Sequence, residues 1–156
     1  MIRHSTFICM ALFGFMPIAG CSSFPRDFRE TVKSIPPPSS IEGAWQGEWV
    51  STGGHRGQLR CLLALKACDP GMSFGIKPIC EARFEAKFAG IFTAHYTTLL
   101  VIESGGETTT LIGDHDLGWL GGGKYHYEAK VTPKTFDATY RSDADRGTFQ
   151  MARPAN

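Results

Sequence analysis

The chain has 156 residues, of which 16 are basic and 15 acidic, and its formal net charge at pH 7 is +1. This balance supplies no basic surface for nucleic acid or anionic lipid, so we expect no nucleic-acid partner. Apart from one apolar segment near the start, no second hydrophobic membrane segment, long-period repeat or coiled-coil heptad is present.

The first twenty residues are typical of a secretory signal peptide. A basic start leads into an apolar stretch at 7–18, which is followed by the small residues Ala19 and Gly20. This stretch is shorter than the ~20 residues that cross a bilayer, and Pro17 also disfavours a long helix. We therefore expect residues 1–20 to be a signal peptide.

Cys21 follows Ile18-Ala19-Gly20, and these four residues resemble the lipobox of bacterial lipoproteins. In that family the cysteine carries a thioether-linked lipid and becomes an acylated N-terminus after cleavage. The resemblance implies lipid attachment at Cys21. Each buried lipid CH₂ contributes ~0.8 kcal/mol, and two or three chains anchor a protein stably. The alternative is an ordinary secreted protein in which Cys21 is free or in a disulfide.

The position after the cysteine bears on localisation. In the lipoprotein family an aspartate there is linked with retention in the inner membrane of some bacteria, whereas this chain has Ser22. The resemblance therefore implies a lipid-anchored protein of the cell envelope, held at the outer membrane and facing the periplasm. The membrane is then a partner through the lipid anchor.

Residues 21–41 are expected to be a lipidated N-terminus and a flexible linker. The segment mixes charged residues and serines with four prolines. The run Pro36-Pro37-Pro38 favours polyproline II, a semi-rigid spacer of ~3.1 Å per residue. A short helix from Phe24 to Lys33 is the alternative, and we prefer a solvated linker. The folded domain is then residues 42–156.

Within this domain the apolar residues recur at every second position, the period of a half-buried β-strand. The clearest case has Cys80 and Phe84 on one side and Glu81 and Lys87 on the other. Turn signals rich in glycine and proline separate eight such segments. The expected strands lie at 43–49, 58–65, 80–88, 91–102, 107–114, 124–131, 135–140 and 147–153.

Eight sequential strands with short connections predict an all-β fold, an eight-stranded antiparallel up-and-down barrel, because closure removes exposed sheet edges. A β-sandwich is the rival arrangement. Gly43, Gly47 and Gly113 lie inside the expected strands, where glycine usually marks a bend or a close backbone approach. An eight-stranded barrel is either filled by side chains or holds one small ligand.

The ends of this domain resemble those of the calycin superfamily, which includes lipocalins and avidins. Gly43-Ala44-Trp45 is similar to the lipocalin G-x-W, and Arg153 ends the last expected strand. The resemblance implies that Trp45 closes one end of the barrel with Arg153 packed across it, a cation–π contact worth ~0.5–2 kcal/mol. The domain is shorter than a lipocalin and lacks the helix expected after the barrel.

Aromatic residues on inward sides are the candidate ligand contacts. The alternative for the tryptophans is a purely structural core, and buried tyrosines commonly have satisfied hydroxyls. We expect a small apolar ligand, a glycan or another envelope protein as partner, and no cofactor. The candidate residues are Trp45, Trp49, Tyr125, Tyr127 and Tyr140.

A metal site is the competing hypothesis. Asp114, His115 and Asp116 place an imidazole between two carboxylates, but a metal needs three or four converging ligands. Adjacent residues of an extended chain point apart, and Asp with Gly is typical of turns. We therefore prefer a turn and predict no metal site; the alternative is a metal-dependent envelope enzyme. Histidines that could complete the site are His55, His95 and His126.

Three cysteines remain in the folded domain: Cys61, Cys68 and Cys80. Their spacing matches no strong zinc motif. If the second and third expected strands form a hairpin, Cys68 and Cys80 lie near its open end, and a disulfide there would contribute ~3 kcal/mol in the chain-entropy model. We expect that pair, with Cys61 free in the core as a small hydrophobic residue.

No Ser-His-Asp order, phosphate-binding glycine loop or nucleophile elbow is visible in the sequence. The sequence thus predicts a non-enzymatic, lipid-anchored envelope protein whose small β-barrel has a binding or structural role. A barrel with a filled interior would be a structural adaptor rather than a ligand carrier.

Overall fold

The structure is a computed structural model, and it describes residues 22–34, 36–37, 39–66, 77–118 and 123–155. The predicted signal peptide, Cys21 and Cys68 lie outside these residues. One helix, α1 (Phe24–Lys33), precedes the strands. The strands are β1 (Gly43–Ser51), β2 (Arg56–Lys66), β3 (Ile79–Phe88), β4 (Phe92–Ser104), β5 (Thr109–Asp116), β6 (Lys124–Val131), β7 (Thr135–Arg141) and β8 (Arg146–Ala152).

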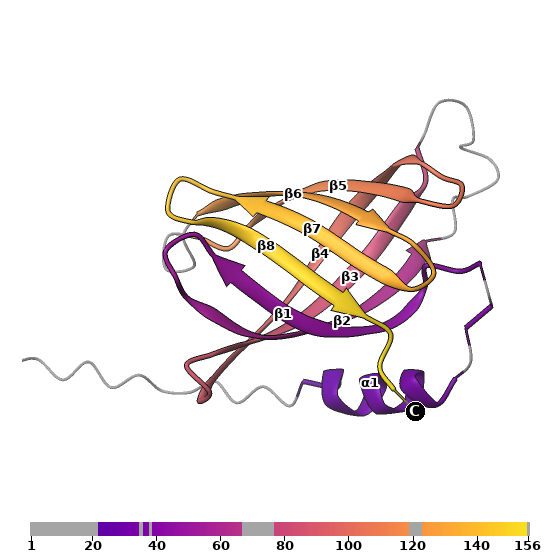
Figure 1. The fold of residues 1–156 in the computed structure, drawn as a ribbon, viewed down its shortest axis with the longest axis horizontal. Coiled ribbons are helices and arrows are strands. Elements are labelled where there is room, and N and C mark those ends of the chain that lie inside the picture. The colour runs from indigo at the N-terminus through magenta and orange to yellow at the C-terminus, as the bar shows by residue number, and fades with distance from the viewer. Residues whose placement is uncertain (1–21, 35, 38, 67–76, 119–122, 156) are drawn as a thin grey trace, which may run out of the picture.

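The eight strands form a closed antiparallel barrel in sequence order, and β1 pairs with β8 to complete the ring (Figure 1). The predicted up-and-down barrel is confirmed, and the sandwich alternative is wrong. Each of the eight expected segments is a strand. Period-two alternation therefore sufficed to locate the sheet, because every strand has one face on the core and one toward the outside.

Glycine permits a close approach where the ring closes between β1 and β8. A Cβ on Gly47 would lie 1.9 Å from the carbonyl oxygen of Gln150 and 2.8 Å from the Cα of Met151. A Cβ on Gly113 in β5 would lie 2.6 Å from the carbonyl oxygen of Leu99. The close approaches expected at these two glycines are therefore present, and both involve backbone that side-chain motion cannot move aside.

One end of the barrel, here called the floor, is closed by Trp45, which is fully buried. The guanidinium carbon of Arg153 lies 3.8 Å from the centroid of its ring. Arg153 also donates to the carbonyl oxygens of Ser40 and Glu42, both at 2.7 Å, and the indole N–H of Trp45 donates to Ile41 at 3.0 Å. The contact that the calycin resemblance implies is present.

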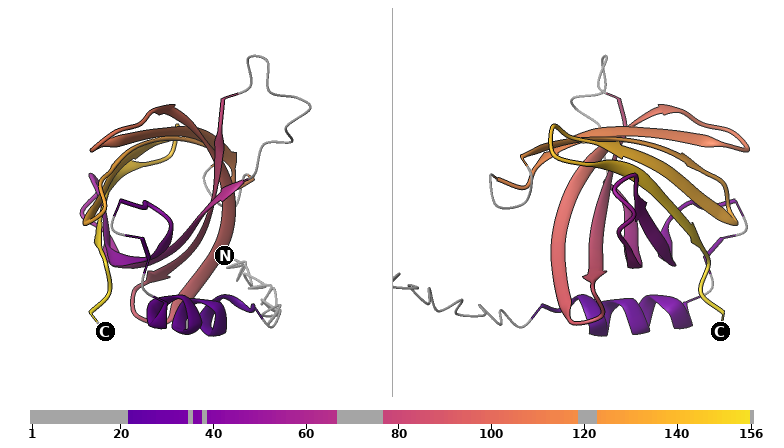
Figure 2. Two further views of the ribbon diagram at one scale, coloured as in Figure 1. Left: turned by 90° about the vertical axis from the view of Figure 1, so that its right-hand side faces the viewer. Right: turned by 60° about the vertical axis from the view of Figure 1, so that its left-hand side comes forward.

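The segment expected to be a solvated linker instead contains α1, which lies along the outside of the barrel (Figure 2). Phe24 and Phe28, one helical turn apart, are 2% and 4% exposed. They pack with Ala44 and Leu62 on the outer face of β1 and β2. The linker prediction is therefore wrong for residues 24–33, because two outward strand positions are apolar and give the helix a surface to cover.

Charged groups on the strands also hold α1. Arg83 donates to the carboxylate of Asp27 at 2.9 Å, and the guanidinium carbon of Arg60 lies 5.0 Å from the centroid of the Phe28 ring. The helix is thus part of the folded body. Across the described ranges, no helix combines the length and apolar character needed to cross a membrane.

Candidate functional site

The end of the barrel opposite the floor, here called the mouth, leads into a cavity of about 800 Å³. The β1–β2, β5–β6 and β7–β8 connections contribute His55, Leu117 and Asp145 to its lining. Mostly apolar cavities of roughly 300–1,000 Å³ are typical of small-molecule sites. Eight aromatic side chains line this cavity, namely Trp49, Phe88, Phe92, Tyr96, Tyr125, Tyr127, Tyr140 and Phe149.

The interior is filled at the floor and hollow at the mouth. At the floor, the ring of Trp45 packs edge-on against Phe136 with centroids 5.8 Å apart, and Leu100, Leu111 and Val131 are fully or almost fully buried. Toward the mouth the aromatic rings stand around open space. An eight-stranded barrel was expected to be either filled by side chains or hollow enough for a small ligand. This barrel is filled in the floor half and hollow in the mouth half.

Four of the five predicted ligand residues line the cavity: Trp49, Tyr125, Tyr127 and Tyr140. The ring of Tyr125 lies 6.2 Å from that of Tyr127 and 5.9 Å from that of Tyr140. The fifth, Trp45, belongs to the floor instead. The structure thus brings the four together, and their contact with a ligand stays a prediction.

Several lining residues were not identified from the sequence. Tyr96 stacks on Phe84 with centroids 5.0 Å apart and faces the interior from β4, while Phe149 packs 5.1 Å from Tyr140. The signal for Tyr96 was available, because Thr98 and Leu100, two and four residues further on, are also inward and buried. Counting by twos back from Leu100 identifies it.

Asp145 is an acidic group at the edge of the cavity. Its carboxylate accepts hydrogen bonds from the hydroxyls of Ser51 at 2.5 Å and Tyr140 at 2.9 Å, and from the backbone N–H of Arg146 at 2.8 Å. Burial alone would raise its pKa, but these donors outweigh burial and lower the pKa of Asp145 below its ordinary value. The carboxylate therefore fixes the orientation of the Tyr140 hydroxyl.

The hydroxyls of Tyr96, Tyr127 and Tyr140 stay neutral in the cavity. Burial raises the pKa of Tyr127 to about 12, and it also raises the pKa of Tyr96 and of Tyr140 above the ordinary value. At neutral pH these groups are uncharged donors and acceptors. The cavity is thus an aromatic chamber with a few polar points, which suits an uncharged or amphiphilic molecule with a large apolar part.

The segment proposed for a metal has its side chains on opposite faces of β5. His115 faces inward, and its ring lies 5.8 Å from the ring of Tyr96. Asp114 faces outward, where its carboxylate lies 2.8 Å from Nδ1 of His126 on β6. The preferred turn is wrong for Asp114 and His115, since β5 continues through Asp116. It is present just after them, where the Asp116 carboxylate accepts from the backbone N–H of Gly118 and Gly118 has a φ of 69°. The expected divergence of adjacent side chains is confirmed.

The remaining candidate ligands are also apart. Asp116 accepts a hydrogen bond from the backbone N–H of Gly118 at 2.8 Å. Nε2 of His95 lies 3.0 Å from Glu85 outside the barrel. His55 borders the mouth. In the part of the chain that the structure describes, no three His, Cys, Asp or Glu side chains converge as metal ligands.

The two described cysteines of the barrel, Cys61 and Cys80, are fully buried thiols. Burial raises the pKa of Cys80 to about 11 and the pKa of Cys61 well above its ordinary value. The core position expected for Cys61 is confirmed. In the structure Cys80 is a free thiol, so the predicted disulfide with Cys68 is not found; Cys68 itself lies outside the described residues.

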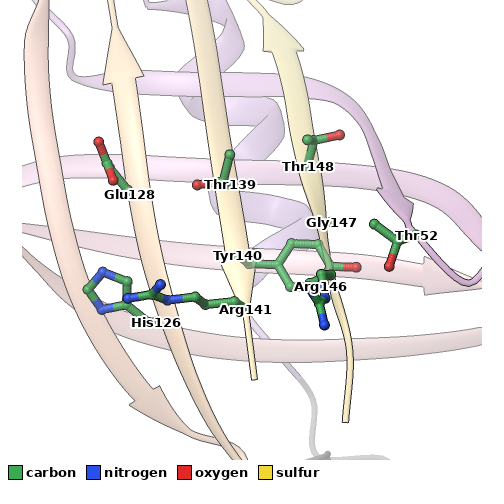
Figure 3. Close-up of a pocket in the computed structure, with 9 residues that line it drawn as sticks. All are labelled: Thr52, His126, Glu128, Thr139, Tyr140, Arg141, Arg146, Gly147 and Thr148. Carbon is green, nitrogen blue, oxygen red and sulfur yellow. The ribbon is translucent and has the colours of Figure 1, made fainter. Parts of the chain in front are cut away.

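A second, smaller hollow of about 330 Å³ lies on the outer face of β6, β7 and β8 (Figure 3). The strand register places His126, Arg141 and Arg146 side by side across these strands. Both arginines are exposed, so water screens any contact that they make with a ligand. The larger cavity with its aromatic lining is therefore the better candidate site.

Comparison with family models, with curated protein sequences and with solved structures gives no match for this chain. The cavity itself carries the functional proposal.

Proposed function

We propose that this protein is a lipid-anchored protein of the cell envelope that binds a small apolar or amphiphilic molecule in the mouth half of its barrel. The observation that carries the proposal is the cavity of about 800 Å³ lined by eight aromatic side chains. No catalytic role is proposed. Binding is favoured over a structural role because the mouth half is hollow.

The chemistry of the lining defines the ligand class. Burial of about 300 Å² of apolar ligand surface contributes ~7 kcal/mol at ~25 cal/mol per Å², before the costs of association are subtracted. The neutral hydroxyls of Tyr96 and Tyr127 can hydrogen-bond a hydroxyl, ester or protonated carboxyl group. A molecule with a hydrocarbon chain or ring system and one polar end fits this lining.

The lipid anchor is proposed from the lipobox-like sequence that ends at Cys21. Because α1 begins at Phe24 and packs on the barrel, only Ser22 and Ser23 separate the proposed acylated residue from the folded body. Two extended residues span roughly 7 Å. An anchor at Cys21 would therefore hold the barrel against the membrane surface rather than at the end of a long linker.

Native mass spectrometry of the mature protein released from detergent tests the binding proposal. We expect a non-covalent adduct of small-molecule mass, carried from the cell or formed by adding a fatty acid. Ala86→Phe places a ring in the cavity and should abolish the adduct. Thr139→Phe adds the same ring on the outer face of β7 and should retain it. No adduct with the unsubstituted protein, or an equal adduct with Ala86→Phe, contradicts ligand binding in the barrel.

A further inference from the structure

The β3–β4 hairpin ends in an exposed apolar tip, Phe88–Phe92. Ile91 and Phe92 are 77% and 62% exposed, and Phe88 is 41% exposed. Ala89 and Gly90 turn the chain with φ angles of 48° and 75°, and the tip contains no charged residue. Three large apolar side chains side by side in water are a feature of surfaces that meet a protein or a membrane.

This tip is held in place by the barrel. The ring of Trp49 lies 4.9 Å from that of Phe88, and its indole N–H donates to the carbonyl oxygen of Lys87 at 3.1 Å. The two strands remain paired up to Phe88 and Phe92. The apolar side chains therefore project from an ordered hairpin.

The tip lies at the mouth, at the same end of the barrel as the start of α1. Phe88 and Phe92 both border the cavity. His95, three residues along β4 from Phe92, lies 5.9 Å from the ring of Phe24, the first residue of α1. Strand residues advance ~3.3 Å each, so the tip is roughly 10–15 Å from that helix end. Figures 1 and 2 show the hairpin end and the start of α1 on the same side of the barrel.

We propose that the tip Phe88–Phe92 inserts into the interface of the bilayer to which the protein is anchored, so that the mouth of the cavity faces the membrane. This inference rests on the proposed lipid anchor at Cys21. That anchor would confine the start of α1, and with it the tip, to the membrane surface. The rings of Phe88 and Phe92 and the side chain of Ile91 match the apolar side chains that bury roughly 5–10 Å into the headgroup and acyl boundary.

The orientation narrows the ligand class of the proposed function. A mouth bordered by Phe88 and Phe92 and turned toward the bilayer gives a hydrocarbon chain a continuous apolar path from membrane to cavity. The ligand is then an amphiphile that resides in the bilayer, such as a fatty acid or a phospholipid chain. A ligand taken from the aqueous phase would need no such path.

Tryptophan reporters in the mature protein test this placement. Ile91→Trp puts the reporter at the tip, and Ala144→Trp puts it at an exposed position of the β7–β8 turn, also at the mouth. Each is reconstituted with phosphatidylcholine vesicles containing brominated phosphatidylcholine, and the signal of the unsubstituted protein is subtracted. We expect the added emission of Ile91→Trp to shift to the blue and to fall by roughly half, because the bromines quench side chains at this depth. The added emission of Ala144→Trp should be unquenched.

Flotation of the same vesicles separates this inference from the anchor. If the unsubstituted protein does not float with the vesicles, the proposed anchor fails, and the inference fails with it. If the protein floats but Ile91→Trp is unquenched, the membrane placement of the tip is overturned and the anchor stands. Equal quenching of Ile91→Trp and Ala144→Trp overturns the proposed orientation.

Discussion

The guanidinium of Arg153 stacks on the ring of Trp45 at 3.8 Å and closes the floor of the barrel. Residues near both ends of the folded domain meet in this contact, since Trp45 lies in β1 and Arg153 follows β8. The closed floor leaves the mouth as the route into the cavity. The contact thus links the stability of the barrel to the direction from which a ligand enters.

Arg153→Ala should lower the free energy of unfolding by about 2–4 kcal/mol, because it removes the stacking contact and leaves the carbonyl groups of Ser40 and Glu42 without their donor. Arg153→Lys keeps the charge but lacks the planar guanidinium group. Its free energy of unfolding should therefore lie between those of Arg153→Ala and the unsubstituted protein. Urea denaturation of the mature protein in detergent measures both. An unfolding midpoint for Arg153→Ala equal to that of the unsubstituted protein contradicts this role.

Phe28→Ala should release α1 from the barrel. Phe28 is 4% exposed and packs on Leu62, so its truncation should cost about 2–4 kcal/mol. Hydrogen exchange of the α1 amides should quicken, while exchange in β6 should change little. Arg29→Ala alters an exposed neighbour in the same helix and is the matched control. Unchanged α1 exchange in Phe28→Ala would show that the helix does not depend on this contact.

The Glu85 carboxylate on β3 links Arg60 on β2 to His95 on β4 beneath α1. We expect acid to weaken this link. Glu85 is 4% exposed and accepts hydrogen bonds from Arg60 at 2.9 Å and from His95 at 3.0 Å. Burial alone would raise its pKa, but Arg60 and His95 outweigh burial and lower it below the ordinary value. The stabilisation is therefore complete above the carboxyl pKa of the unfolded chain, ~4.3, and is lost as the pH falls through the lower folded pKa.

Denaturation midpoints measured between neutral and strongly acidic pH check this sign. Glu85→Gln should be less stable at neutral pH, by about 1–3 kcal/mol because Arg60 is partly exposed, and should show a flatter profile on acidification. A variant with the same acid profile as the unsubstituted protein would rule out Glu85 as the titrating group.

Gly47→Ala should strain the closure of the barrel. The new Cβ would lie 1.9 Å from the carbonyl oxygen of Gln150, so β1 and β8 must separate, at a cost of about 1–3 kcal/mol. Gly105→Ala is the control, because no atom lies within 4 Å of the Cβ added there. Thermal unfolding compares them. Equal melting temperatures for the two variants would show that the closure tolerates a side chain.

The sequence was informative wherever one face of a strand is buried. Alternation around Phe84 located the barrel strands, and the opposed directions of Asp114 and His115 followed from the same rule. The sequence was uninformative about the outer face of the strands. Ala44 and Leu62 look like ordinary strand residues, and only the position of α1 over them shows that they are buried. The partners of Phe24 on the barrel are distant in sequence, so its burial follows from tertiary packing rather than from local pattern.

The size of the cavity could not be predicted from the sequence, for a related reason. Period two puts Trp45 and Trp49 on the same side of β1, yet one fills the floor and the other borders the open space. That difference depends on how far each lies along the barrel axis and on what faces it across the interior. Phe136 packs against Trp45, whereas Trp49 meets Phe88 beside the cavity.

Quenching of Trp49 by a brominated fatty acid is the most direct test of the claim that the mouth half of the barrel is a ligand site. Trp49 lines the cavity, and its share of the emission is isolated by subtracting the spectrum of Trp49→Phe. We predict saturable quenching of that share in the unsubstituted protein and its loss in Ala86→Phe. Emission from Trp49 that is unaffected by the brominated fatty acid, or is quenched equally in Ala86→Phe, would contradict the account.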